Sequence, residues 1–269
     1  MPSTASSGAA PPASLDSTLR ALVSPANLPL PLPIVHTSIA RWFGSIVSQG
    51  RLEPRQCPVF GERLIYLFYG GAFYRPSEFT TKNVDELPVA FLFEPAALTK
   101  IARYYPFDTG ALVSGRLGAS GDRLRPFRSA FQVPGGDIQT PTRMVHHLFN
   151  SNENYIYGRV DPDCQTKPSP LPELFELMTQ DLTSKGTDHR QCCIECHSVD
   201  AMELGQHLLW LAFPENHYPY FVQLFGSKRW KRIPVCYPYR AHAIFHTREI
   251  AYDIHQQALR FIELYRKAA

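Results

Sequence analysis

The placement of the prolines constrains this chain more than any other sequence feature. Of the 269 residues, 24 are proline, and they cluster in the first 35 residues and between the apolar segments. Because proline lacks a backbone N–H and interrupts helices and inner strands, this distribution favours short strands and irregular loops over a helical bundle. With 44% hydrophobic and 19% charged residues, the chain can still bury a sizeable core.

The N-terminal segment and the cysteines indicate the cellular compartment of the chain. Residues 1–30, rich in Ser, Ala and Pro, are predicted to be a flexible tail, and residues 31–269 a single domain. The N-terminus lacks the features of a signal peptide, and no stretch approaches the roughly 18 apolar residues of a membrane span. Three of the six cysteines fall within five residues, which is a poor disulfide framework. We therefore expect a reduced, cytoplasmic protein without membrane contact.

Short apolar runs predict the strands of the domain. They are rich in β-branched and aromatic residues and are bounded by proline, glycine or polar turns, as buried strands are. The runs are 32–38 (LPIVHTS), 64–70 (LIYLFYG), 88–95 (PVAFLFEP), 191–198 (QCCIECHS), 207–215 (HLLWLAFPE) and 232–239 (RIPVCYPY).

Apolar residues at helical spacing predict helices over 39–49, 171–182 and 248–267. Gly50 follows the first of these, at a position where glycine commonly ends a helix. The segment 108–166 is rich in Gly, Ser, Arg and Asn and shows few periodic runs, as irregular loops do. Strands, an irregular middle, further strands and flanking helices together indicate an α+β domain. No phosphate loop of the P-loop or Rossmann type is present.

Two segments near the N-terminus combine polar or aromatic side chains with apolar strands. His36 lies in the first strand and is either a core histidine or a ligand-binding one. In LIYLFYGGAFYR, the side chains of Tyr66, Tyr69, Tyr74 and Arg75 crowd around a glycine pair. The tyrosines either pack in the core or line a site where glycine lets a flat ligand approach the backbone.

Glu195, in the segment CCIEC, is a carboxylate inside an apolar strand. Burying it is costly unless it is paired or used, although a half-exposed strand would leave it in water. Strand alternation places Glu195 on one face with Cys193 and His197, and Ile194 with Cys196 on the other.

Zinc is the competing interpretation of this segment. Its potential ligands are His189, Cys192, Cys193, Cys196 and His197. A structural zinc site needs four ligands, normally from two separated pairs, and no second CxxC pair exists. A further ligand would have to come from Cys57, Cys164 or Cys236, and we expect no metal here.

The order of these segments resembles the DarT-type branch of the ADP-ribosyltransferase superfamily over roughly residues 33–214. The family opens with a strand carrying His and a helix ending in a Gly-Leu-like turn, matched by IVHTS and QGRL. An aromatic strand with a nearby Arg follows, matched by LFYGGAFYR, and then a segment matched by FDTGA at 107–111. The strand with the catalytic Glu and the apolar strand after it correspond to RQCCIECHS and HLLWLAFPE.

The resemblance implies split antiparallel β-sheets flanked by helices, with NAD as the substrate. Glu195 would bond a ribose hydroxyl and favour the oxocarbenium-like cation formed when the nicotinamide–ribose bond breaks. Tyr69 would stack on nicotinamide, His36 would hold the adenosine-side ribose, and Arg75 would pair with the pyrophosphate or the acceptor. The remaining residues implied for the NAD site are Thr37, Tyr66, Tyr74, Asp108 and Thr109.

The acceptor is suggested by the segment GSKRWKR. Its basic residues surround one aromatic residue, as in single-stranded nucleic-acid sites; they are Lys228, Arg229, Lys231 and Arg232 around Trp230. A solvated basic turn with one packed Trp is the alternative, and the net charge of +3 is too weak to decide. Together with the family resemblance, this segment leads us to expect a mono-ADP-ribosyltransferase that modifies DNA or RNA.

The resemblance also implies a role as a toxin or phage-defence effector, with an antitoxin or inhibitory protein as a partner. Modification of a protein instead of a nucleic acid, or simple hydrolysis of NAD, are close variants of this activity. A non-enzymatic nucleic-acid-binding module with a Cys/His zinc site is the alternative from another class.

Overall fold

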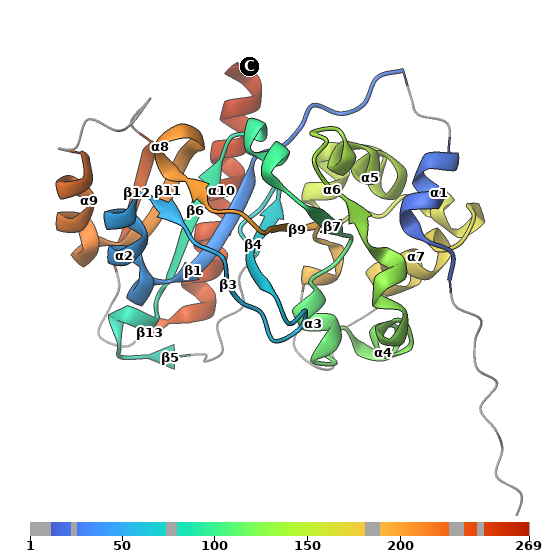
Figure 1. The fold of residues 1–269 in the computed structure, drawn as a ribbon, viewed down its shortest axis with the longest axis horizontal. Coiled ribbons are helices and arrows are strands. Elements are labelled where there is room, and N and C mark those ends of the chain that lie inside the picture. Colours follow the sequence, from blue (N-terminus) through green and yellow to red (C-terminus); the bar gives the residue numbers. More distant parts are fainter. Residues whose placement is uncertain are drawn as a thin grey trace, which may run out of the picture.

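The structure is a computed structural model that describes residues 12–22, 26–73, 80–180, 189–225, 234–240 and 245–268. It has the expected α+β architecture, in which helices flank one large mixed sheet (Figure 1). None of the helices within these ranges is both long enough and apolar enough to cross a membrane. All six cysteines are free thiols.

Within the described residues the large sheet has nine strands, and only its β11–β12 pair is parallel. The strands in spatial order are β12 (Val235–Tyr239), β11 (Leu208–Pro214), β6 (Pro88–Phe93), β1 (Ile34–Ile39), β4 (Arg63–Tyr69), β9 (Glu195–Ser198), β7 (Arg103–Tyr105) and β8 (Val133–Pro134), with β3 (Arg55–Gln56) paired to β4. Two small sheets consist of β10 (Met202–Glu203) with β2 (Arg51–Leu52) and β13 (Phe245–His246) with β5 (Thr80–Thr81). The six strands predicted from the apolar runs are thus confirmed, but the one predicted over 191–198 begins only at Glu195, because His189–Cys192 form a 3₁₀ helix.

The sheet divides between β1 and β4. Strand β1 pairs with β6 along its whole length, but it pairs with β4 only at Ile34–Tyr69 and Val35–Phe68. Beyond this point, β4 continues its pairing with β9 on one edge and with β3 near its start. The expected split between antiparallel strands is therefore present, and it opens a wedge between β1 and β4.

The helices cover both faces of the sheet and one of its ends (Figure 1). They are α1 (Leu15–Ala21), α2 (Phe43–Gln49), α3 (Thr109–Val113), α4 (Gly118–Leu124), α5 (Thr140–Phe149), α6 (Asn152–Ile156), α7 (Leu171–Thr179), α8 (Leu204–His207), α9 (Tyr218–Phe225) and α10 (Thr247–Ala268). Helices α1 and α4–α7 gather beside β7 and β8, whereas α10 packs against β6 and β11.

Strands β6 and β11 form the centre of the core. Every residue of both strands is buried, which explains why their sequences are continuous apolar runs and not alternating ones. Phe43 of α2 packs on Phe213 and Phe91, with ring centroids 5.0 Å and 6.0 Å apart. Helix α2 therefore covers one face of these strands, and α10 covers the other.

The predicted helices are confirmed with adjusted ends. The first begins as a short 3₁₀ segment, Ala40–Trp42, before α2, and Gly50 ends it with φ of +70°, in the left-handed conformation that favours glycine. The second ends at Thr179, where Gln180 turns extended, and the third spans the full α10.

Two parts of the chain differ from the sequence-based expectation. Residues Leu15–Ala21, inside the predicted tail of 1–30, form α1, which packs against α5 with Leu15 fully buried. The i, i+4 pair of Leu15 and Leu19 gives this short helix an apolar side that the tertiary contacts stabilise. The segment 108–166, which shows little periodicity, contains α3 to α6.

The turn after β8 allows a test of the packing that supports this end of the sheet. A Cβ atom at Gly135 would lie 2.0 Å from the backbone oxygen of Ile101, and the Gly135 amide already donates to Ala102 O. Because backbone cannot yield as a flexible side chain can, Gly135→Ala should lower the free energy of unfolding by roughly 3 kcal/mol. Urea unfolding measures this change.

Gly61→Ala is the matched control. Gly61 has φ of +70° but open space around the new Cβ, so the substitution should cost only about 1 kcal/mol of backbone strain. Equal losses in the two variants would contradict the close backbone approach at Gly135.

Candidate active site

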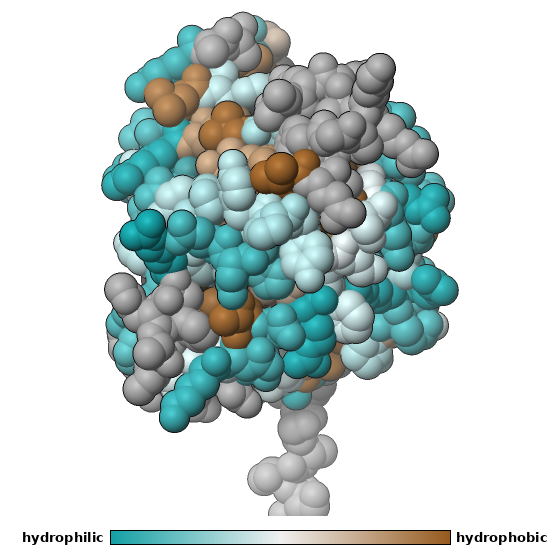
Figure 2. Space-filling model, turned by 90° about the vertical axis from the view of Figure 1, so that its left-hand side faces the viewer, coloured by the Kyte–Doolittle hydropathy of each residue, from teal (hydrophilic) through white to brown (hydrophobic). Residues whose placement is uncertain are grey.

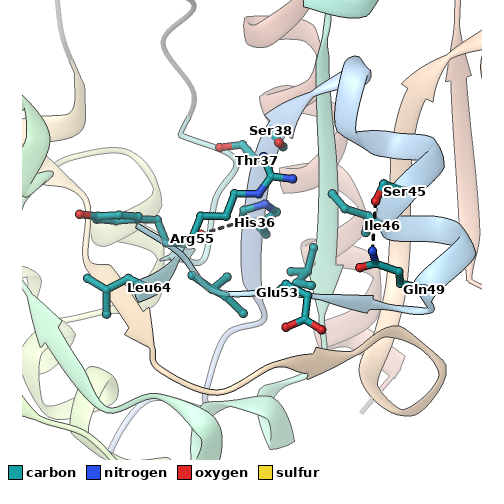
Figure 3. Close-up of a pocket in the computed structure, with 12 residues that line it drawn as sticks. His36, Thr37, Ser38, Ser45, Ile46, Gln49, Glu53, Arg55 and Leu64 are labelled. Atoms are coloured by element: carbon teal, nitrogen blue, oxygen red, sulfur yellow. Dashed lines mark hydrogen bonds between the residues drawn. The ribbon is translucent and has the colours of Figure 1, made fainter. Parts of the chain in front are cut away.

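A pocket of about 190 Å³ occupies the wedge between β1 and β4 (Figure 3). Its lining comes from β1 (His36, Thr37, Ser38), α2 (Ser45, Ile46, Gln49), the β2–β3 segment (Leu52, Glu53, Arg55) and β4 (Leu64, Ile65, Tyr66). Three residues expected at the NAD site, His36, Thr37 and Tyr66, therefore meet here. The pocket exists because β1 and β4 stop pairing after two residue pairs.

His36 offers this pocket an unprotonated ring nitrogen. Its Nδ1 lies 2.8 Å from the backbone oxygen of Tyr66, and because a carbonyl only accepts, Nδ1 carries the proton. The pKa of His36 is lowered to about 4, chiefly by burial; the bond to Tyr66 O opposes this shift, and the charge of Arg55 adds a smaller lowering. The imidazole is thus neutral near pH 7, and Nε2 can accept a hydrogen bond from a ligand hydroxyl.

Arg55 provides a cation beside His36 (Figure 3). The carbon at the centre of its guanidinium group lies 3.9 Å from the ring centroid of Trp42, so a cation–π contact orients the group. The other charged residue that lines the pocket, Glu53, forms an ion pair with Arg51 at 2.5 Å. The planar guanidinium of Arg55 suits a phosphate or carboxylate ligand.

Glu195 is buried at the start of β9, with 1% of its surface exposed. Its Oε1 accepts a hydrogen bond from Thr109 Oγ1 at 2.6 Å, and its Oε2 accepts one from the Thr109 backbone N–H at 3.1 Å. A third contact joins Oε1 to His197 Nε2 at 2.5 Å. The cost of burying the carboxylate is therefore offset by three polar contacts.

Asp108 holds the residue that binds Glu195. It caps α3 by accepting from the Ala111 backbone N–H at 2.6 Å, and it forms an ion pair with Arg190 at 2.6 Å. The fold therefore brings Asp108, Thr109 and Glu195 together, as the order of the motifs suggests. Here Asp108 supports Thr109, and neither residue lines the pocket.

Tyr66 connects the pocket with Glu195. Cross-strand pairing sets Tyr66 opposite His197 and Phe68 opposite Glu195. The Tyr66 and His197 rings lie edge to face with centroids 4.7 Å apart, and Tyr66 Oη lies 2.6 Å from Cys57 Sγ. Burial is the largest cause that raises the pKa of Tyr66, and the hydrogen bond to Cys57 raises it further. The hydroxyl of Tyr66 therefore stays protonated. Contacts run from the pocket through Tyr66 and His197 to Glu195, which is not itself a lining residue.

Tyr69 lies apart from this group. It is fully buried, its hydroxyl accepts from the Leu32 backbone N–H at 2.8 Å, and its ring packs against Tyr155. Burial raises the pKa of Tyr69. Since Tyr69 pairs with Ile34 where the sheet is still joined, its side chain belongs to the core and not to the wedge.

Several expected site residues lie outside the described part of the chain. They are Tyr74, Arg75, Lys228, Arg229, Trp230, Lys231 and Arg232. Among the residues that the structure does describe, no group of three or more His, Cys, Asp or Glu side chains is placed to hold a metal ion.

The sequence did not indicate three features of the site, namely Arg55, Arg103 and the role of His197. Arg103 Nε donates to His197 Nδ1 at 3.0 Å because the two residues are directly opposite in the β7–β9 pair. The strand alternation does place His197 on the Glu195 side, but the pairing that supplies Arg103 follows only from the strand order. Arg55 carries no pattern beyond its charge.

Comparison with known proteins adds one structural likeness. No family model and no curated protein matches the sequence significantly. The chain is similar in structure to the DarT protein of Thermus sp. 2.9 in complex with NAD+. The two share 10% sequence identity over 78% of this chain and 96% of that chain, with a TM-score of 0.40. At this identity the likeness concerns the fold alone, and we therefore infer the chemistry from the residues of the site.

The protonation of His36 can be tested through stability. Its pKa is about 4 in the folded protein against an ordinary value of 6.5, so between these values the unfolded chain takes up the proton and the folded one does not. The contribution of neutral His36 to the free energy of unfolding is therefore fully present above pH 6.5 and is lost as the pH falls towards 4. The wild-type protein should lose free energy of unfolding between about pH 7 and about pH 4.5, and in His36→Gln this loss should be smaller by roughly 2 to 3 kcal/mol.

Urea unfolding at the two pH values gives this difference for wild type and variant. His246→Gln, at an exposed position on β13, serves as the control. If His36→Gln and His246→Gln show the same pH dependence as wild type, His36 does not lose its proton on folding.

Proposed function

We propose that this protein is an NAD-dependent mono-ADP-ribosyltransferase that modifies DNA or RNA. The proposal depends chiefly on one observation: a wedge between two strands holds a neutral acceptor, His36, and a cation, Arg55, and the contacts of Tyr66 and His197 connect it with a buried and firmly held carboxylate, Glu195. Neutral acceptors suit ribose hydroxyls, cations suit a pyrophosphate, and a fixed carboxylate suits a developing sugar cation.

The proposed reaction begins with cleavage of the bond between nicotinamide and ribose. The electron pair of this bond leaves with nicotinamide, and C1′ of the ribose becomes an oxocarbenium-like cation. A nucleophilic atom of the acceptor then bonds to C1′ and its proton passes to water. Cleavage moves the positive charge from the nicotinamide ring to the ribose, and the negative charge of Glu195 favours the cation at the ribose over the ground state, which is the condition for lowering the barrier.

The pocket residues receive roles from their contacts. His36 Nε2 would accept from a ribose hydroxyl beside Thr37, and Arg55 would pair with the pyrophosphate. Arg75 keeps its expected role at the pyrophosphate or the acceptor. Tyr66, which lines the pocket, takes the stacking role on nicotinamide that the sequence favours for Tyr69.

Access to Glu195 is part of the proposal. Tyr66 and His197 lie on the contact path between the pocket and the carboxylate. Tyr66 is half-buried, and among the described residues its hydroxyl bonds only a thiol, so its ring can turn at modest cost. We expect NAD to displace this ring as the ribose reaches Glu195.

The surface beside the pocket favours a nucleic-acid acceptor. Trp42 is 40% exposed and stacks with Arg55, and α9, which packs on α2, exposes about half of Tyr218 and Tyr220. Exposed aromatic rings next to cations suit unpaired bases. Where its residues are described, the face drawn in Figure 2 is mostly hydrophilic. The basic segment 226–232, which lies outside the described residues, keeps the nucleic-acid-binding role expected from its sequence.

Nicotinamide release from NAD tests the proposal. Wild-type protein should release nicotinamide faster when single-stranded DNA or RNA is added. Glu195→Gln keeps the shape of the side chain and removes its charge, so release should fall about 100-fold or more while the fold is kept. Glu94→Gln is the control, because Glu94 also contacts a histidine, His207, outside the site.

The other outcomes separate the alternatives. Release without any acceptor would indicate NAD hydrolysis or a protein target. No release under any condition would overturn the transferase proposal in favour of a binding module. The toxin or phage-defence role and an antitoxin partner belong to the proposal through the family resemblance.

A further inference from the structure

His197 is enclosed between Glu195 and Arg103. It has no exposed surface; its Nε2 lies 2.5 Å from Glu195 Oε1, and its Nδ1 lies 3.0 Å from Arg103 Nε. The rings of Tyr66, Phe60 and Tyr105 surround it at centroid distances of 4.7, 4.9 and 5.4 Å. The imidazole therefore has a single orientation in the packed core.

Arg103 fixes the position of the imidazole proton. A guanidinium N–H can only donate, so His197 Nδ1 must carry the lone pair. The proton then lies on Nε2 and is donated to Glu195 Oε1. Arg103 is itself anchored, since it forms an ion pair with Glu62 and lies 4.6 Å from the ring centroid of Phe60.

The two oxygens of Glu195 are consequently not equivalent. Oε1 accepts two hydrogen bonds, from Thr109 Oγ1 and from His197, whereas Oε2 accepts the Thr109 backbone N–H. Because a carboxylate oxygen has two lone pairs in its plane, these bonds saturate Oε1 and leave acceptor capacity on Oε2.

We infer that His197, oriented by Arg103, is a positioning residue that anchors Glu195 through Oε1 and leaves Oε2 to accept the ribose hydroxyl of the substrate. The inference rests on the proposed function. Without the His197 donor, two of the three hydrogen bonds that the described residues make to the carboxylate remain, both from Thr109, and the carboxylate is held less firmly. The geometry at the sugar is then lost although the charge remains.

A pair of amide substitutions separates the two contacts of His197. The Gln amide nitrogen can reach the place of Nε2 and donate to Glu195, whereas the shorter Asn amide reaches only the place of Nδ1, beside Arg103. In His197→Gln, kcat for nicotinamide release should stay near wild type. In His197→Asn, kcat should fall about 100-fold with KM for NAD little changed. His207→Gln, at the other histidine–glutamate contact, is the control.

A measurement on the wild-type protein avoids variants that fail to fold. In ¹⁵N NMR spectra of the imidazoles, His197 should show a protonated Nε2 and an unprotonated Nδ1. A proton on Nδ1, or equal losses of kcat in the folded Gln and Asn variants, would overturn the inference and leave the proposed function intact. A wild-type protein that releases no nicotinamide would overturn both.

Discussion

The short pairing between β1 and β4 is the constraint on which the site depends. The two strands stay joined for two residue pairs and then separate, because β4 is bound to β9 on its other edge and β3 enters the gap. Separation frees the backbone oxygen of Tyr66, and a buried carbonyl without a partner is costly. His36 supplies the missing donor from its Nδ1. The His36 side chain therefore replaces one hydrogen bond between the strands and keeps the wedge open. Because its proton is on Nδ1, its Nε2 becomes an acceptor.

Much of the fold follows from the sequence, because the central elements are buried on both sides. Strands β6 and β11 are continuous apolar runs, and Gly50 ends α2 as its position predicts. Three helices between 108 and 166, namely α3, α4 and α6, could not be predicted in this way. They have five to seven residues, and α3 and α4 contain glycine, so their stability comes from a cap such as Asp108 and from neighbours far away in the sequence. The same holds for α1, whose apolar side is only one turn long.

For the site, the sequence identified residues but not their pairing. Glu195, Asp108 and Thr109 do meet, and His36, Thr37 and Tyr66 do share a pocket. The choice between Tyr66 and Tyr69 depends on which side of β4 faces the wedge, and the two tyrosines point to opposite sides because they are three residues apart. The side of β4 that faces the wedge, like the contact between Arg103 and His197, is set by the strand register. Local sequence patterns do not encode this register.

Thr109 has a double position, as the first residue of α3 and as the partner of both oxygens of Glu195. A helix of five residues opens more readily than the sheet around it. When its first turn opens, the backbone and the hydroxyl contact to the carboxylate are released in the same event. The lifetime of the aligned carboxylate is thus tied to the opening rate of one helical turn, and a substitution in α3 far from any substrate would act on it through that rate.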